Sequence, residues 1–232
     1  MSLFFDIGAN RGEATWIALN TYGFDKVVAF EPAPRMYKLL AENYFYDSRV
    51  VPLKFAVSDV GNETIEFYEC GNGELNQGDG SSTMELSWIE GEDSRIKNIE
   101  YRTVSANTCT MDWAIEQYGL PDLVKIDVEG GESKVIAGMS YKPERLCFEW
   151  HIEHMDRHVE DLKRLAKVNG YTEYALQYIT HHLLEPTEYR PISQADSIYD
   201  WLDETRDEWQ SSGWITGGHL RQKADVGMIW VR

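Results

Sequence analysis

Acidic side chains and one imidazole stand at the ends of two apolar runs in the middle of the sequence. Asp127 and Glu129 close the run at 123–128, and Glu149 with His151 close the next one. Carboxylates and imidazoles accept protons, and together they also suit Mg²⁺ or Mn²⁺. We therefore predict that Asp127, Glu149 and His151 form a catalytic centre. A metal site at Asp127, Glu129 and Glu149 is the accompanying hypothesis.

Simpler structural roles compete with these interpretations. Asp127 is also placed to cap the following helix or to pair with Lys125. Lys125 itself has the pattern of a strand residue whose ammonium reaches out to the surface. His154 and His158, together with His151, resemble zinc ligands, but no cysteine supports them and they begin an otherwise polar helix. For that pair we expect a solvated helix face.

A glycine-containing loop, residues 6–12, follows the first apolar run of the chain. Gly8 and Gly12 allow a tight turn and a close approach of the backbone to a ligand. A dinucleotide site would need the pattern G-x-G-x-x-G to hold a pyrophosphate, but Asn10 replaces its second glycine. S-adenosylmethionine has no phosphate and carries ammonium and sulfonium charges. Acidic neighbours such as Asp6 therefore favour it as the cofactor.

Glu31 follows the second apolar run, at the distance from the loop where nucleotide-binding folds place a carboxylate. Such a carboxylate accepts hydrogen bonds from both hydroxyls of a ribose. The competing interpretation is that Asp6 and Glu31 only cap the helices that follow them.

Apolar runs and segments of helical spacing alternate along the chain, which predicts βαβ crossovers. We expect a single α/β domain over residues 1–232, with a doubly wound, mostly parallel, seven-stranded sheet and an insert before the last strand. In such sheets ligands bind beyond the carboxyl ends of the strands. The expected strands lie at 3–7, 26–30, 50–57, 64–68, 100–104, 123–128, 145–150, 174–179 and 226–231, and the expected helices around 14–18, 36–43, 111–118, 135–139 and 155–169.

The insert, residues 180–224, is too long for a simple hairpin connection, and we predict that it caps the substrate side of the site. Its rings suit stacking on the C–H faces of a sugar. Helical spacing indicates, however, that Trp201 and Trp209 belong to the core. Trp214 and His219 are then the better candidates for substrate contact. The other rings in or beside this stretch are those of Tyr178, His181, His182, Tyr189 and Tyr199.

The formal net charge is −17, from 39 acidic against 22 basic residues. A surface this negative repels a phosphate backbone and anionic membranes, and no apolar run is long enough to span a bilayer. Nucleic acid and a membrane span are therefore excluded. Cys70, Cys109 and Cys147 indicate neither a disulfide framework nor a zinc site. We expect a cytoplasmic protein, or a domain excised from a longer polypeptide and fused to or associated with glycan-assembly enzymes.

Four motifs, in the same order and spacing, resemble the FkbM-like methyltransferases. They are FDIGANRG at 5–12, VAFEP at 28–32, AVSD at 56–59 and KIDVEG at 125–130. The resemblance covers residues 3–151 and the last strand, and it extends to the Ser-rich segment at 80–82. It implies a Rossmann-like class I methyltransferase fold that uses S-adenosylmethionine.

Individual site residues also follow from this resemblance. One departure, at 13–14, replaces an aromatic or small apolar pair of many relatives, but it lies on a helix and puts little in doubt. By position, the resemblance implies that Asp6, Gly8 and Asn10 bind the cofactor, that Glu31 binds its ribose, and that Ala56, Val57 and Ser58 lie beside its adenine.

The resemblance and the acidic residues together predict an O-methyltransferase that acts on a hydroxyl of a sugar or glycan. Methyl transfer to an alcohol is an in-line displacement, which needs aligned atoms and a group that takes the proton. A non-sugar metabolite or peptide is the alternative acceptor. A non-catalytic cofactor-binding domain is a further alternative, although the intact acidic residues argue against it. The missing glycine pattern disfavours a nucleotide-linked oxidoreductase.

Overall fold

The computed structural model describes residues 1–71, 80–92, 94, 96–178, 185–211 and 226–232. The elements in chain order are β1 (Leu3–Ile7), α1 (Glu13–Asn20), β2 (Lys26–Phe30), α2 (Pro34–Asn43), β3 (Val50–Leu53), β4 (Ala56–Val57), β5 (Thr64–Cys70), α3 (Leu86–Glu90), β6 (Tyr101–Cys109), α4 (Met111–Tyr118), β7 (Leu123–Ile126), α5 (Glu132–Ala137), β8 (Arg145–His151), η1 (Ile152–His154), α6 (Met155–Arg164), η2 (Leu165–Asn169), β9 (Glu173–Tyr178), β10 (Arg190–Pro191), η3 (Ile192–Ser197), α7 (Ile198–Ser211) and β11 (Val226–Val231).

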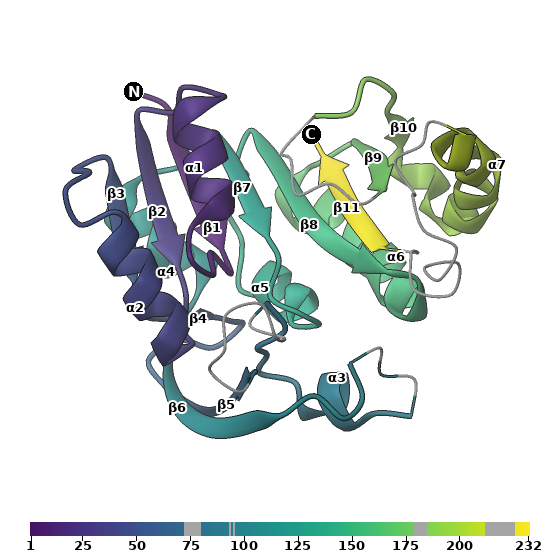
Figure 1. Ribbon diagram of the computed structural model, residues 1–232. Coiled ribbons are helices and arrows are strands. Elements are labelled where there is room, and N and C mark those ends of the chain that lie inside the picture. The colour runs from purple at the N-terminus through teal and green to yellow at the C-terminus, as the bar shows by residue number, and fades with distance from the viewer. Residues whose placement is uncertain (72–79, 93, 95, 179–184, 212–225) are drawn as a thin grey trace.

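A doubly wound α/β sheet organises the molecule, as the sequence predicted. The described strands of this sheet run in the order β10-β9-β11-β8-β7-β1-β2-β3. Strands β8, β7, β1, β2 and β3 are parallel neighbours, and β11 is antiparallel to both β8 and β9. Figure 1 shows α1 and α2 on one face of the sheet and α4 on the other. The chain runs outward from β1 to β2 and β3 and later returns to β7 on the other side of β1, so the chain order reverses between β1 and β7.

Strand β1 is buried along its whole length, because helices cover both faces of the sheet. Phe4, Phe5 and Ile7 have no exposed surface. Each fully buried side chain of this kind contributes roughly 1.5–3 kcal/mol to folding. The central strands therefore hold the loops at their carboxyl ends on a rigid base.

One detail of the predicted sheet was wrong. The expected strand at 50–57 is broken: β3 ends the large sheet, whereas β4 pairs with β6 in a second sheet of order β4-β6-β5. The chain leaves the large sheet there because Ala56 is buried in a separate apolar cluster with Phe67 and Ala106. The large sheet has eight described strands, one of them the two-residue β10 that pairs with β9, which is close to the predicted seven.

The predicted helix at 155–169 is confirmed, as α6 continued by the π-helical turn η2. It ends at Gly170, whose left-handed backbone (φ 76°) suits glycine at this position. Among the described residues, none of the helices combines the length and the apolar character needed to cross a bilayer.

The described part of the insert packs against the sheet. Trp201 is 3% exposed and lies edge-on to Tyr174, with ring centroids 5.2 Å apart. Its prediction as a core residue is confirmed. In the sheet, Tyr174 lies opposite Val231 of β11. It stands near the start of β9, whereas Tyr178 ends that strand. Residues 180–184 and 212–224 of the expected cap lie outside the described residues, and they include His181, His182, Trp214 and His219. The backbone of Tyr178 and Trp209 is described, but their side chains are not.

Gly8 connects β1 to the loop after β7. Its backbone has φ +78°, and a Cβ added there would lie 1.8 Å from the carbonyl oxygen of Asp127. Position 8 therefore requires glycine because of the Asp127 carbonyl in the loop after β7, as well as because of any ligand.

We predict that Gly8→Ala destabilises the protein far more than Gly23→Ala. Gly23 also has a left-handed backbone, at φ +70°, but nothing lies within 4 Å of an added Cβ. Left-handed strain alone should cost Gly23→Ala about 1–2 kcal/mol. The collision with Asp127 should add at least ~2 kcal/mol at Gly8. Urea denaturation of both variants measures the difference, and equal losses would contradict the close-contact explanation.

Candidate functional site

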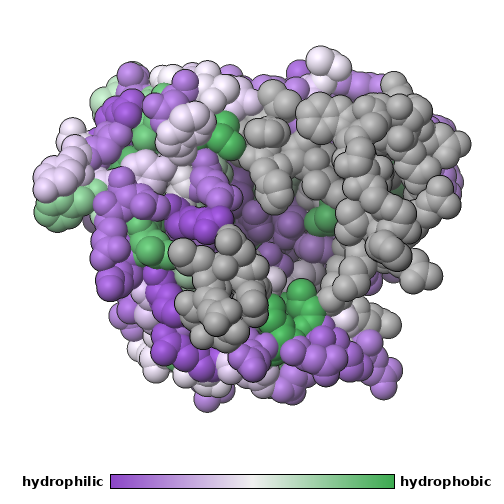
Figure 2. Space-filling model, in the orientation of Figure 1, coloured by the Kyte–Doolittle hydropathy of each residue, from purple (hydrophilic) through white to green (hydrophobic). Residues whose placement is uncertain are grey.

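A pocket of about 480 Å³ lies at the carboxyl ends of β1, β2, β7 and β8. Figure 2 shows its recess in the surface, with hydrophilic residues at its visible floor. The start of β11 and the segment before α3 complete its walls. The polar residues that line it are Asn10, Arg11, Glu13, Glu31, Ser82, Lys125, Asp127, Glu129 and Glu149.

Glu31 forms one end of the pocket. Its two carboxylate oxygens accept hydrogen bonds from the backbone N–H groups of Asn10 and Ala33, each at 2.8 Å. Asn10 can aim its N–H there because its backbone is left-handed, at φ 50°. Each oxygen retains a further lone pair for a ligand. Burial raises the pKa of Glu31 to about 7, although the two backbone donors oppose this shift.

Lys125 is the hub that joins the loops after β1 and β7. Its ammonium donates to the carbonyl oxygen of Gly8 at 3.0 Å and pairs with Asp127 Oδ2 at 3.2 Å and Asp6 Oδ1 at 3.5 Å. The prediction that this ammonium reaches the surface was wrong, because the side chain is 10% exposed. Burial alone would lower the pKa of Lys125, but Asp127 and Asp6 outweigh it and raise that pKa.

Asp6 lies behind the loop rather than in the pocket. It is completely buried, and its Oδ2 accepts a hydrogen bond from the Thr15 hydroxyl at 2.7 Å. Its predicted role as a cofactor ligand stays a prediction, since Asp6 does not line the pocket. In the structure, Asp6 holds Lys125 and the start of α1 in place. Gly8 and Asn10 do line the pocket.

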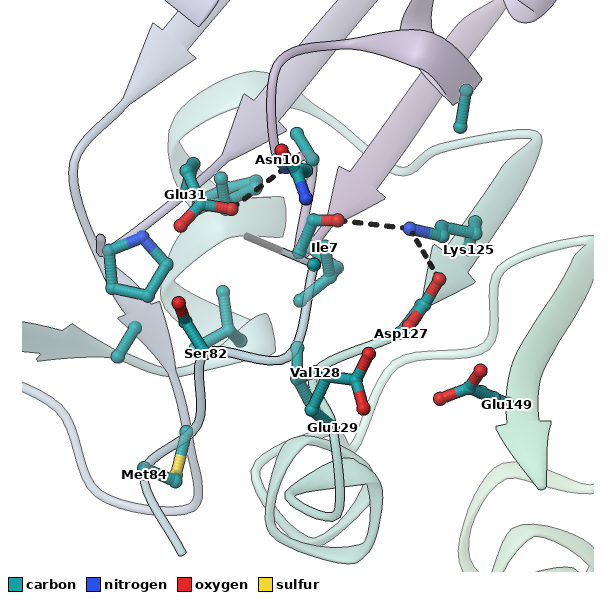
Figure 3. Close-up of a pocket in the computed structure, with 18 of the residues that line it drawn as sticks. Ile7, Asn10, Glu31, Ser82, Met84, Lys125, Asp127, Val128, Glu129 and Glu149 are labelled. Carbon is teal, nitrogen blue, oxygen red and sulfur yellow. Dashed lines mark hydrogen bonds and ion pairs between the residues drawn. The ribbon is translucent and has the colours of Figure 1, made fainter. Parts of the chain in front are cut away.

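Glu129, Glu149 and His151 come together at the other end of the pocket (Figure 3 shows the two glutamates). One ligand atom from each lies within 4.8 Å of the others, and His151 Nε2 is 2.9 Å from Glu149 Oε2. Burial and the proximity of Glu149 raise the pKa of Glu129. Burial and the proximity of Asp127 raise the pKa of Glu149.

The grouping differs from the predicted metal site in one member. Asp127 lines the pocket, but its Oδ2 is engaged by Lys125, so the ion pair that competed with a catalytic role is present. His151, rather than Asp127, lies beside Glu129 and Glu149. His151 is 7% exposed and does not line the pocket, but its Nε2 contacts Glu149, which does.

The loop after β7 has an unusual shape that Glu132 maintains. Glu129 has a left-handed backbone, at φ 56°, which is uncommon for a residue with a side chain. Glu132 is 2% exposed, and its Oε1 accepts the N–H groups of Val128 and Gly130, both at 3.1 Å. From the other side, the Thr83 hydroxyl donates to the Glu129 carbonyl at 2.7 Å. We did not predict Glu132, although an acid in the first turn of a helix is a recognisable signal.

The predicted adenine segment is placed in part against the pocket. Ala56 and Val57 line it, together with Phe67 and Met84, which sequence reasoning missed. Ser58 does not line it, because this residue is buried and its hydroxyl donates to Asp59 at 2.9 Å.

The predicted solvated face at His154 and His158 was wrong for His158. This residue is 2% exposed, packs against the Phe148 ring at 5.6 Å and lies 3.4 Å from Asp161 Oδ2. His154 is half-buried beside Trp88. Neither belongs to a group of three metal-ligating side chains among the described residues.

The raised pKa of Glu31 predicts a pH-dependent stability. The pKa rises from an ordinary value of 4.5 to about 7, so between these values the folded protein binds more protons than the unfolded chain. The free energy of unfolding should therefore fall as pH rises through this window, by up to ~3 kcal/mol. Glu31→Gln should flatten this dependence, whereas the exposed control Glu116→Gln should not. Urea denaturation at pH 4.5 to 8 measures it, and an unchanged slope in Glu31→Gln would disprove it.

Known proteins of similar fold include methyltransferases. No curated protein matches the sequence. The fold is similar to that of methyltransferase FkbM from Methylobacillus flagellatus KT, with a TM-score of 0.52 and 15% identity over 78% of this chain. The chain covers 40% of that protein. A precorrin-6y C5,15-methyltransferase from Geobacter metallireducens GS-15 has a TM-score of 0.46 and 11% identity, with 100% of this chain and 79% of that one covered.

The family comparison is more specific than these likenesses of fold. The model of the methyltransferase FkbM domain matches residues 6–204. This range includes both ends of the pocket, from Glu31 to Glu149, and most of each surrounding motif. The chain therefore belongs to the FkbM methyltransferase family.

Proposed function

We propose that this protein transfers a methyl group from S-adenosylmethionine to a hydroxyl of a sugar or glycan. The observation that carries the proposal is one pocket with Glu31 at one end and Glu129 with Glu149 at the other. The first end suits a ribose, and the second suits a hydroxyl that must lose a proton.

The residues present fit S-adenosylmethionine. The free lone pairs of Glu31 would accept the ribose hydroxyls, and Val57, Phe67 and Met84 offer apolar surface to the adenine. At the other end of the pocket, the positive ammonium and sulfonium groups would favour the ionised carboxylates of Glu129 and Glu149. When bound, the cofactor supplies a methyl group on a positively charged sulfur.

Glu149 is the residue that would accept the proton of the acceptor hydroxyl. It lines the pocket, and His151 holds it through the 2.9 Å contact to Oε2. Of the predicted catalytic residues, we therefore assign the base to Glu149 and positioning roles to His151 and Asp127. Asp127 acts through Lys125, which keeps the loops after β1 and β7 together.

Electrostatics favour a neutral acceptor over a phosphorylated one. The two basic residues that line the pocket are already paired: Arg11 with Glu13 at 2.8 Å and Lys125 with Asp127. Three further carboxylates, those of Glu31, Glu129 and Glu149, line the same cavity. A phosphate would meet repulsion here without a free cation among the described residues of the lining. The insert, residues 180–224, is the proposed cap that selects a sugar.

We expect S-adenosylmethionine, and not NADH, to bind in calorimetry, and labelled methyl groups to reach neutral glycosides faster than the corresponding sugar phosphates. Glu149→Gln should lower kcat about 10²- to 10⁴-fold, because it removes the proton acceptor. The affinity of Glu149→Gln for the cofactor should change less than about threefold, which corresponds to less than about 0.7 kcal/mol of binding free energy.

The exposed variant Glu116→Gln serves as the matched control and should keep the activity of the unaltered protein. Absence of cofactor binding would refute the proposed function. Full activity of Glu149→Gln, with binding intact, would refute only the role of this residue. A peptide or non-sugar metabolite as the preferred acceptor would replace the sugar assignment.

A divalent cation is the alternative way to activate the hydroxyl, and the grouping of Glu129, Glu149 and His151 within 4.8 Å favours it. Two carboxylates and an imidazole fit Mg²⁺ or Mn²⁺, which would lower the pKa of a bound hydroxyl.

If this alternative holds, chelator treatment should lower turnover at least about tenfold, and Mn²⁺ should restore it. Mn²⁺ binding, followed by electron paramagnetic resonance without any acceptor, should weaken in Glu129→Gln and persist in Glu116→Gln. Full turnover after chelation, with no Mn²⁺ binding, would reject the metal and leave direct proton transfer to Glu149.

A further inference from the structure

Residues 83–88, which precede and begin α3, lie against the loop that carries Glu129. Thr83 pairs with Tyr68 of β5 and donates its hydroxyl to the Glu129 carbonyl at 2.7 Å. Glu85 forms an ion pair with Lys134 of α5 at 2.7 Å. These contacts fix the segment that leads into α3 against the loop after β7.

Trp88 of α3 makes the most specific contact of this segment. Its indole is 9% exposed, and Nε1–H donates to Glu129 Oε2 at 3.1 Å. The same ring stands edge-on to His151, with centroids 4.6 Å apart and an interplanar angle of 74°. A Cβ on Gly130 would lie 2.8 Å from this ring, so the glycine leaves the space that the indole occupies.

We propose that Trp88 is a positioning residue that holds the Glu129 carboxylate at the acceptor end of the pocket. This inference rests on the proposed function for its catalytic meaning. Trp88 does not line the pocket, so it acts through Glu129 rather than on the acceptor itself.

The need for such a donor follows from the charges around Glu129. Glu149 lies beside it, and two carboxylates this close repel each other in a site with little water. Among the described residues, the indole is the one side-chain donor to the Glu129 carboxylate. The backbone of Glu129 is fixed separately, by Thr83 and Glu132, so the indole N–H determines where the carboxylate points rather than where the loop runs.

A double-mutant cycle of Trp88→Phe and Glu129→Ala separates positioning from packing. The phenyl ring keeps most of the apolar contact but loses the N–H donor. Because the carboxylate loses its indole donor, Trp88→Phe should lower kcat about tenfold or more. The affinity for S-adenosylmethionine should change less than about threefold. In the Glu129→Ala background the same substitution should cause no further loss, because no carboxylate remains to be positioned.

Trp113→Phe is the matched control, since this half-buried indole packs on Phe55 and Tyr118 away from the loop. It should leave kcat unchanged. Equal losses from Trp88→Phe in both backgrounds would show that Trp88 only supports packing, and would overturn the proposal. An unchanged kcat in Trp88→Phe would do the same. If Trp88→Phe folds poorly, benzothienylalanine at position 88 keeps the bicyclic shape without the N–H, and the same outcomes apply.

A spectroscopic measurement keeps this test independent of the reaction. The indole N–H resonance of Trp88, assigned by its loss in Trp88→Phe, should shift in Glu129→Ala while that of Trp113 stays in place. An unshifted resonance would overturn the positioning role. If the unaltered protein bound the cofactor but methylated no acceptor, the proposed function would fall while this spectrum still decided whether Trp88 holds Glu129.

Discussion

The buried ammonium of Lys125 is the interaction on which the arrangement of the pocket depends. It connects the Gly8 carbonyl, Asp6 and Asp127, which belong to the two loops that meet where the chain order of the sheet reverses. A buried ammonium without partners would be costly, but here two carboxylates and a carbonyl surround it. Gly8 makes the approach possible, because a side chain there would collide with Asp127. The same contacts therefore close the loop after β1 and direct the loop after β7 into the pocket.

A consequence of these contacts is that both basic residues lining the pocket, Lys125 and Arg11, are already paired with carboxylates. Lys125 is shared between Asp6 and Asp127, and Arg11 is paired with Glu13. The carboxylates of Glu31, Glu129 and Glu149 are left to determine the potential that a ligand meets. Burial raises the pKa of all three, which means that their ionised forms are disfavoured until a hydrogen-bond donor or a cation arrives. The pocket is thus built to gain from a cationic cofactor and from hydroxyl groups.

The sequence predicted the half of the site that depends on local pattern. The doubly wound sheet, the loop at Gly8 and Asn10, and Glu31 after β2 follow from apolar periodicity and from glycine spacing, and the structure places all three residues at the pocket. It could not predict which way side chains turn within a loop. Asp6 turns toward Lys125, and His151 rather than Asp127 joins the two glutamates, because charge pairing in three dimensions decides these directions.

The two ends of the pocket differ in how they are built, and this difference has a consequence for function. The Glu31 end is formed by consecutive βα units, so its geometry follows from the sheet itself. The Glu129 end is held by Glu132 of α5 and by Thr83 and Trp88 of a segment that precedes it by some forty residues in the chain. Changes in that segment can therefore alter the Glu129 end, the proposed acceptor end, while the sheet, Lys125 and the Glu31 end keep their contacts. A fold of this kind can retain one cofactor while the acceptor changes, since different parts of the chain support the two ends.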